Sequence, residues 1–159
     1  PRRPRRPRRP ARRRKRMADE HTLTAEVLTP EGPVFEGELF QLSTRTVVGE
    51  IGIRARHAPM LARLAPAELR LYATEAEATS QGEGLRYAAA EGWLEVFANK
   101  AVVLIGEAIA PDELDAADQR ERLKSAEQRL EEAEEGSAAY EVAERDRARA
   151  EAFLVLAER

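Results

Sequence analysis

The hydrophobic pattern of the chain changes at Pro111, and this change constrains the fold more than any other feature of the sequence. Before it, from about residue 22 to 109, apolar residues come in short and often alternating runs, as half-buried strands require. After it the chain is rich in Ala, Glu, Arg and Leu, which favour helices. The sequence therefore predicts an α+β chain, with strands first and helices last.

The strand-like runs lie close together and are separated by turn residues. In residues 23–27 apolar and polar side chains alternate, and Trp93 alternates with Glu95 and is expected in the core. Many short strands favour a β-sandwich or flattened barrel, and the lack of strand–helix alternation argues against a parallel nucleotide-binding sheet. Residues 81–84 lack the lysine and helix start of a phosphate loop, so we expect a hairpin turn there. The remaining expected strands span residues 34–35, 39–43, 69–72, 85–88 and 102–105.

The segment after Pro111 predicts two helices joined by a short turn. Asp112 is expected as the N-cap or first-turn acid of the first helix, Gly136 ends it, and Ser137 caps the second. Because alanine supplies much of both apolar stripes, the hairpin should bury little surface and pack weakly, which suits a conformational switch. A plain antiparallel coiled coil is the simpler alternative. The stripe residues are Leu123, Ala126, Leu130 and Ala133, then Ala139, Val142, Ala143, Ala150, Phe153, Leu154 and Ala157.

The composition argues against several kinds of site. The sequence has 0 Cys and 2 His residues, which excludes thiolate chemistry, disulfides and a histidine-rich metal cage. No catalytic constellation of Ser, His and Asp or of paired carboxylates stands out, so we expect no catalytic residue, metal or cofactor. There is no apolar run of about 18 residues and no signal-peptide pattern, so a reducing, cytosolic compartment is expected.

The first sixteen residues, PRRPRRPRRPARRRKR, form a basic head. Of the 26 Lys and Arg residues eleven fall here, whereas all 29 Asp and Glu residues fall later. Such a segment should be disordered and could attract nucleic acid or anionic lipid, although it has no aromatic residue to stack on bases. Met17 begins what resembles an ordinary protein start, so we interpret residues 1–16 as a head that need not be native, and we predict no nucleic-acid partner.

Three pieces of sequence occur in an order that resembles a known family. They are TPEGPVFEGE at 29–38, GEIGIRARHAPMLARL at 49–64 and EGWLEVFANKAVVLIGEA at 91–108, and an Ala-Glu-Arg helical hairpin follows. Together they resemble the bacterial epsilon subunit of F-type ATP synthases, over about residues 22–159. The pattern G-E-x-G-I-x-x-x-H-A-P-x-L is the specific part, because its glycines, acid, histidine and proline each need a fixed place.

The resemblance implies an antiparallel β-sandwich of about ten strands in residues 17–109 and an antiparallel two-helix hairpin in residues 110–159. It also implies a non-catalytic rotor subunit of the central stalk, peripheral to the cell membrane on its cytoplasmic side. Such a subunit links the gamma subunit to the c-ring and couples proton translocation to ATP synthesis. In many bacteria its last helix reaches the alpha/beta catalytic hexamer and inhibits ATP hydrolysis.

The resemblance carries over to a few residues around the motif. Glu50 and His57 match the motif acid and histidine, so we expect a loop that faces the c-ring and gamma, with Arg54 and Arg56 adding charge to it. The family usually has Pro-Gly where Ala55 and Arg56 stand, and Gly-Gly where Glu91 and Gly92 stand, and these differences suggest altered turns within the same fold. A solvated acid at Glu50 and a backbone-bonded ring at His57 remain the alternatives.

Two features of the helices bear on regulation. Some family members bind ATP through a motif that Leu114 and Asp115 match, but Asp118 replaces its arginine and would repel phosphates, so ATP binding is expected to be weak or absent. A nucleotide-sensing binding module is therefore only the alternative function. The cluster Arg145, Arg147 and Arg149 could meet an acidic loop of the catalytic subunit. The competing interpretation is a solvated face on which these arginines pair with the interleaved acids Glu144, Asp146 and Glu151. Glu141 and Arg145, four residues apart, would support the exposed side of the same helix.

Overall fold

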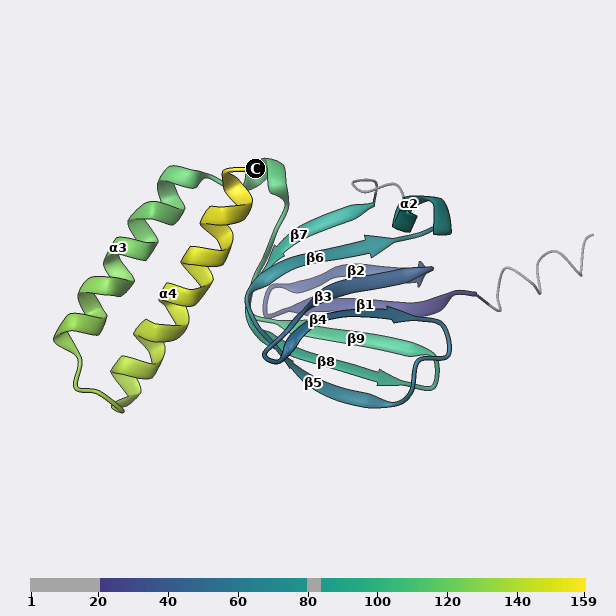
Figure 1. Ribbon diagram of the computed structural model, residues 1–159, viewed down its shortest axis with the longest axis horizontal. Coiled ribbons are helices and arrows are strands. Elements are labelled where there is room, and N and C mark those ends of the chain that lie inside the picture. Colours follow the sequence, from purple (N-terminus) through teal and green to yellow (C-terminus); the bar gives the residue numbers. More distant parts are fainter. Residues whose placement is uncertain (1–20, 80–83) are drawn as a thin grey trace, which may run out of the picture.

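The computed structural model describes residues 21–79 and 84–159. A β-sandwich forms one part of the molecule, and a pair of helices packs against one of its ends (Figure 1). The basic head predicted for residues 1–16 and most of the turn predicted at 81–84 lie outside the described residues.

Ten strands form the sandwich, as predicted. One layer has the order β4-β3-β6-β7-β10 and the other β5-β8-β9-β1-β2, and a single pairing of Thr46 in β3 with Leu64 in β5 joins them. The neighbours are antiparallel except β1 and β9, which run parallel. The strands are β1 (Leu23–Thr29), β2 (Gly32–Leu39), β3 (Gln41–Thr46), β4 (Gly49–Arg54), β5 (Met60–Leu64), β6 (Ala67–Tyr72), β7 (Leu85–Ala89), β8 (Gly92–Phe97), β9 (Lys100–Ile105) and β10 (Ala108–Ile109).

Alternation along the strands produces the core between the two layers. In β9 the side chains of Ala101, Val103 and Ile105 point inward and are buried, while the residues between them face outward. Gly92 at the start of β8 is required by packing, because a Cβ atom there would lie 1.9 Å from the carbonyl oxygen of Leu104. The expectation that Trp93 lies in the core is wrong: it is on the outward face of β8 and 49% exposed.

The segment 49–61 is not the single loop that the motif led us to expect. It contains the whole of β4, a turn, and the first residues of β5. Ile51 and Ile53 of β4 pair with Thr44 and Leu42 of β3 and alternate with glycine and charged residues. Because two glycines interrupt this short alternation, the strand pattern is hard to distinguish from a turn in the sequence.

The C-terminal helices follow the predicted hairpin with a change at each end of the first helix, which starts after a 3-10 turn and ends at Glu132, four residues before the expected Gly136. A 3-10 turn, η1 (Pro111–Glu113), precedes α3 (Ala116–Glu132) and α4 (Ala138–Ala157), and a short helix, α2 (Glu75–Thr79), was not predicted. Asp115, not Asp112, caps α3, because its carboxylate accepts a 2.7 Å hydrogen bond from the amide of Ala117. Ser137 caps α4 as predicted.

Small residues line the contact between the helices, and a fully buried phenylalanine packs the second helix against the sandwich. Ala126, Ala143 and Ala150 are buried in or beside the helix–helix seam. Phe153 of α4 is fully buried against Ala88 and Ala90 at the end of β7. The hairpin is therefore folded back onto the end of the sandwich where β7 ends (Figure 1).

Candidate functional site

At the sandwich end remote from the hairpin, the turn after β4 is held by cross-loop hydrogen bonds. Arg56 has a φ of 64°, a left-handed conformation that is costly for a residue other than glycine. Its amide donates a 2.8 Å hydrogen bond to the side-chain oxygen of Asn99, whose amide group donates to the carbonyl of Thr22 at 2.9 Å. The turn is thus tied to the β8–β9 turn and to the start of β1.

The charged side chains of this turn are arranged around a cavity. Arg54 donates from Nε to the side-chain oxygen of Gln41 at 2.7 Å, and its guanidinium lies 4.9 Å from the centre of the Phe40 ring. Arg54 and Arg56 both line a cavity of ≈ 520 Å³. His57 lies beside them with Nδ1 2.8 Å from the carbonyl oxygen of Ala58, which is the backbone-bonded alternative.

Glu50 does not belong to this group. It lies at the start of β4, and the four residues from Glu50 to Arg54 separate the two by about 13 Å along the strand. It lines a cavity of ≈ 440 Å³ together with Val155 and Arg159 near the end of α4. The structure therefore separates the four residues expected at one interface: Arg54, Arg56 and His57 lie at one end of the sandwich and Glu50 at the end covered by the hairpin.

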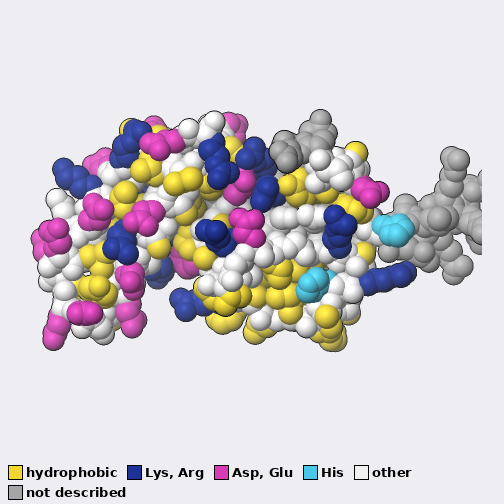
Figure 2. Space-filling model, viewed as in Figure 1, with side chains coloured by type: hydrophobic (Ala, Val, Ile, Leu, Met, Phe, Trp, Pro, Cys, Tyr) yellow, Lys and Arg dark blue, Asp and Glu magenta, His cyan; other side chains and the backbone are white. Residues whose placement is uncertain are grey.

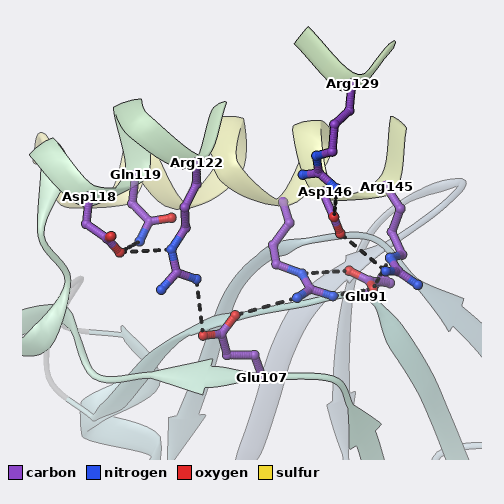
Figure 3. Close-up of polar contacts among 9 residues, drawn as sticks. Glu91, Glu107, Asp118, Gln119, Arg122, Arg129, Arg145 and Asp146 are labelled. Carbon is purple, nitrogen blue, oxygen red and sulfur yellow. Dashed lines mark hydrogen bonds and ion pairs between the residues drawn. The ribbon is translucent and has the colours of Figure 1, made fainter. Parts of the chain in front are cut away.

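The three arginines at the centre of α4 have different partners. Arg149 makes a two-point contact with Glu91, with Nη2 to Oε1 at 2.5 Å and Nε to Oε2 at 3.2 Å. Arg145 contacts the same carboxylate at 3.4 Å and also pairs with the adjacent Asp146 at 3.3 Å. Among the described residues, the one ion pair of Arg147 is with Glu151 of its own helix, at 3.6 Å. Two of the three arginines therefore pair with the sandwich, a contact that neither interpretation of the sequence foresaw (Figure 3).

These contacts perturb two ionisable groups. Burial alone would lower the pKa of Arg149, but the hydrogen bond and charge of Glu91 more than offset it, so that the pKa is raised above its ordinary value. Burial alone would raise the pKa of Asp146, but hydrogen bonds from Arg129 and Arg145 hold it below its ordinary value. Both groups are charged at neutral pH, and their partners stabilise that state.

The partial nucleotide motif has a structural use in this chain. Leu114 is half-buried beside Phe153, and Asp115 caps α3. Asp118 pairs with Arg122 at 2.9 Å, and the buried Gln119 donates to Asp118 at 3.3 Å. All of these side chains are thus engaged within the protein itself.

The cavity between the two helices has a volume of ≈ 450 Å³ and mixed charge. Its three arginines are each paired with an acid: Arg122 with Asp118, Arg129 with Asp146 at 2.9 Å, and Arg149 with Glu91. A polyphosphate would have to displace these carboxylates and would face their negative charge. The prediction that ATP binding is weak or absent is therefore retained.

Glu91 and Glu107 are the functional candidates that the sequence did not reveal. The substitution of a family glycine by Glu91 was visible, but it was interpreted as a change of turn. Within residues 21–79 and 84–159, no three His, Asp or Glu side chains are grouped to hold a metal ion. None of the helices in that part of the chain is long and apolar enough to cross a membrane.

Comparison with known proteins identifies the family to which the chain is similar. Residues 22–111 match the sequence model of the family described as ATP synthase, Delta/Epsilon chain, beta-sandwich domain. The ATP synthase epsilon chain of Persephonella marina is 38% identical over 133 residues, which are 83% of this chain and 93% of that one. The epsilon chain of Sulfurihydrogenibium sp. is 32% identical over 132 residues, 83% of this chain and 94% of that one.

Solved structures share the fold. A chain in the cryo-EM structure of the Euglena gracilis mitochondrial ATP synthase (OSCP/F1/c-ring) superposes with a TM-score of 0.64 at 19% identity, covering 87% of this chain and 81% of that one. The family match covers more than half of the protein, and the two relatives extend the similarity into the helical hairpin. The chain belongs to the ATP synthase delta/epsilon chain family, among its epsilon chains.

Proposed function

We propose that this epsilon chain is a non-catalytic subunit of the central stalk in a rotary ATP synthase. In this role it links the gamma subunit to the c-ring and helps to couple proton translocation to ATP synthesis. The observation that carries the proposal is the match to bacterial epsilon chains over 93% and 94% of their own lengths, sandwich and hairpin included. The subunit would be peripheral to the cell membrane on its cytoplasmic side, held there by the complex.

The surface of the sandwich suits a protein-binding role. On the outer face of the β5–β8–β9 layer, Trp93 and Leu104 are directly opposite each other and 49% and 48% exposed. Phe97, further along β8, and Leu61 of β5 are also exposed. Hydrophobic side chains gather on the sandwich surface, whereas acidic and basic side chains are interleaved over the hairpin (Figure 2). We propose that this apolar face binds the gamma subunit.

The two ends of the sandwich then have different partners. Arg54, Arg56 and His57 remain candidates for contacts with gamma or the c-ring, since they lie away from the hairpin. Glu50 is exposed beside the end of α4, so a contact between Glu50 and the c-ring would lie next to that helix end. Arg145, Arg147 and Arg149 are candidates for contacts with the alpha/beta hexamer when the hairpin is extended, which would inhibit ATP hydrolysis.

Affinity purification of the tagged native chain tests the stalk assignment. Gamma and the c-ring should be recovered with it, and the variants Trp93→Ser and Leu104→Ser should reduce the recovery of gamma. A chain that purifies without either subunit would overturn the assignment.

The inhibitory role is tested separately in the reconstituted complex. A chain that lacks residues 137–159 should allow faster ATP hydrolysis than the full chain. Equal rates would remove the inhibitory role and leave the stalk assignment in place.

A further inference from the structure

Two acids of the sandwich are held next to each other where the hairpin docks. The amide of Ala90 donates to the carbonyl of Glu107 at 2.9 Å, and the amide of Gly106 donates to the carbonyl of Glu91 at 3.2 Å. These hydrogen bonds join the β7–β8 turn to the β9–β10 turn, so the carboxylates of Glu91 and Glu107 share one small surface. Two neighbouring carboxylates repel each other unless cations lie between them.

The hairpin supplies those cations from both of its helices. Arg149 binds Glu91 at 2.5 Å and reaches Glu107 at 3.6 Å, so it bridges the two acids. Arg145 of α4 reaches Glu91 at 3.4 Å, and Arg122 of α3 reaches Glu107 at 3.6 Å (Figure 3). We call these five residues, Glu91, Glu107, Arg122, Arg145 and Arg149, the clasp.

The clasp is better shielded from water than an ordinary surface ion pair. The side chains of Arg149 and Glu91 are 23% and 21% exposed, and two hydrogen bonds join them. Because of this burial and bidentate geometry, the ion pair is stronger than a fully solvated pair. One helical turn further along α4, Phe153 is buried against Ala90, the residue next to Glu91. An apolar contact and an ionic contact therefore secure the same helix to the same turn.

We propose that Glu91 and Glu107 act as a built-in acidic receptor for the hairpin. They hold it folded against the sandwich without a bound ligand, and they keep Arg145 and Arg149 from acidic partners on other subunits. Only the identity of that competing partner, the catalytic hexamer, rests on the proposed function. The folded hairpin and an arginine-mediated contact elsewhere are then mutually exclusive, because one guanidinium group cannot pair fully with both sets of acids.

The proposal predicts a specific response to salt. Because ion pairs weaken as the Debye length falls from about 30 Å at 0.01 M to about 3 Å at 1 M salt, the undocked fraction of hairpins should rise over that range. Added nucleotide should change the undocked fraction much less than salt does, since the arginines of the cavity between α3 and α4 are already paired with acids. A hairpin held by Phe153 alone, with no contribution from the ion pairs, would instead be insensitive to salt.

Docking can be measured on the full chain by energy transfer between two dyes. The sequence has 0 Cys, so cysteines introduced at the exposed positions Val48 and Val142 give specific labelling of the β3–β4 turn and of α4. In this background Glu91→Gln removes the main acid of the clasp. Glu127→Gln is the matched control, because Glu127 is exposed on α3 and makes no ion pair within the described residues.

Glu91→Gln should raise the ratio of undocked to docked hairpins about tenfold at low salt, as loss of a charge-assisted contact predicts. It should also flatten the salt dependence, and Glu107→Gln should act in the same direction. Trp93 fluorescence would report whether the sandwich remains folded. The clasp proposal would be wrong if Glu91→Gln and Glu127→Gln showed the same docked fraction at every salt concentration while the sandwich stayed folded.

A second measurement separates the clasp from the inhibitory role. In the reconstituted complex, Glu91→Gln should hydrolyse ATP more slowly than Glu127→Gln, since more hairpins are free to extend. If Glu91→Gln releases the hairpin in the isolated chain but leaves hydrolysis unchanged, the clasp is supported and the inhibitory role is wrong. If it releases nothing in the isolated chain, the clasp is wrong whatever the rate of hydrolysis.

Discussion

Replacement of Arg56 by glycine should stabilise the isolated protein. The φ of 64° at Arg56 costs a non-glycine residue about 1–2 kcal/mol, and glycine removes that cost. Glycine also makes the unfolded chain more flexible, which opposes the gain by about 0.4–1 kcal/mol. The hydrogen bond from the Arg56 amide to Asn99 is unaffected because it is a backbone bond. The net expectation is a gain of about 1 kcal/mol.

Thermal and urea unfolding of the full chain measure this gain. For a chain of this size, about 1 kcal/mol corresponds to a rise in Tm of roughly 2–4 °C, with the urea m-value unchanged. Arg63→Gly is the matched control, since Arg63 is an exposed arginine inside β5 without a left-handed backbone. That variant should lose about 0.5–1 kcal/mol, because glycine weakens a strand interior.

A loss of stability in Arg56→Gly as large as that in Arg63→Gly would refute the reasoning, since strain would then contribute nothing. A gain in stability for Arg56→Gly would also bear on function. A costly backbone conformation that is kept at a charged position is typical of a site where the side chain is needed. If Arg56 contacts a stalk partner, Arg56→Gly should stabilise the isolated chain and yet weaken recovery of that partner, an effect that relief of strain alone cannot produce.

Further predictions concern the hairpin. Phe153→Ala should release α4 from the sandwich, because truncation of a fully buried phenylalanine costs about 3–5 kcal/mol of stability. Amide hydrogen exchange should then accelerate in α4 but not in β8 or β9. Equal acceleration in all three elements would contradict this. Asp115→Ala should cost about 1 kcal/mol in urea unfolding through loss of the α3 cap, and Asp115→Asn should retain most of it; equal losses would rule out capping. Arg129 and Arg145 hold the pKa of Asp146 below its ordinary value of 3.8, so the stability that this carboxylate contributes is present above 3.8 and is lost as pH falls through the folded-state pKa. Asp146→Asn should therefore make the stability depend less on pH below 3.8. An unchanged pH dependence of stability in that range would count against this. Calorimetry at physiological salt should detect no micromolar ATP binding to the isolated chain, and a clear micromolar isotherm would show that the paired arginines can be displaced.

Much of the fold follows from local patterns. The alternation in β1, β8 and β9 identifies strands directly, because one face of each is buried in the core and the other is not. Ser137 was recognisable as a cap because it follows Gly136 and precedes a helical pattern. The motif around His57 identified the family, and with it the number of strands.

Other features depend on neighbours that the sequence does not reveal. Trp93 alternates like a core residue, yet the register of β8 places it on the outer face, because alternation marks two faces without saying which is buried. Asp112 and Asp115 are both plausible caps by residue type. The turn η1, which begins at Pro111, delays the start of α3, so that Asp115 and not Asp112 occupies the cap position.

The sequence by itself determined the two structural classes, their boundary near Pro111, and the arginines along one helix. It could not determine which acids those arginines meet. Spacing of four residues predicted Glu141 as the partner of Arg145, since helical neighbours are set by local geometry. The tertiary structure instead pairs Arg145 and Arg149 with Glu91, which is 58 residues away from Arg149. The burial of Phe153 against β7 orients α4 and brings these charges together, and such long-range packing is not encoded in the spacing of any one helix.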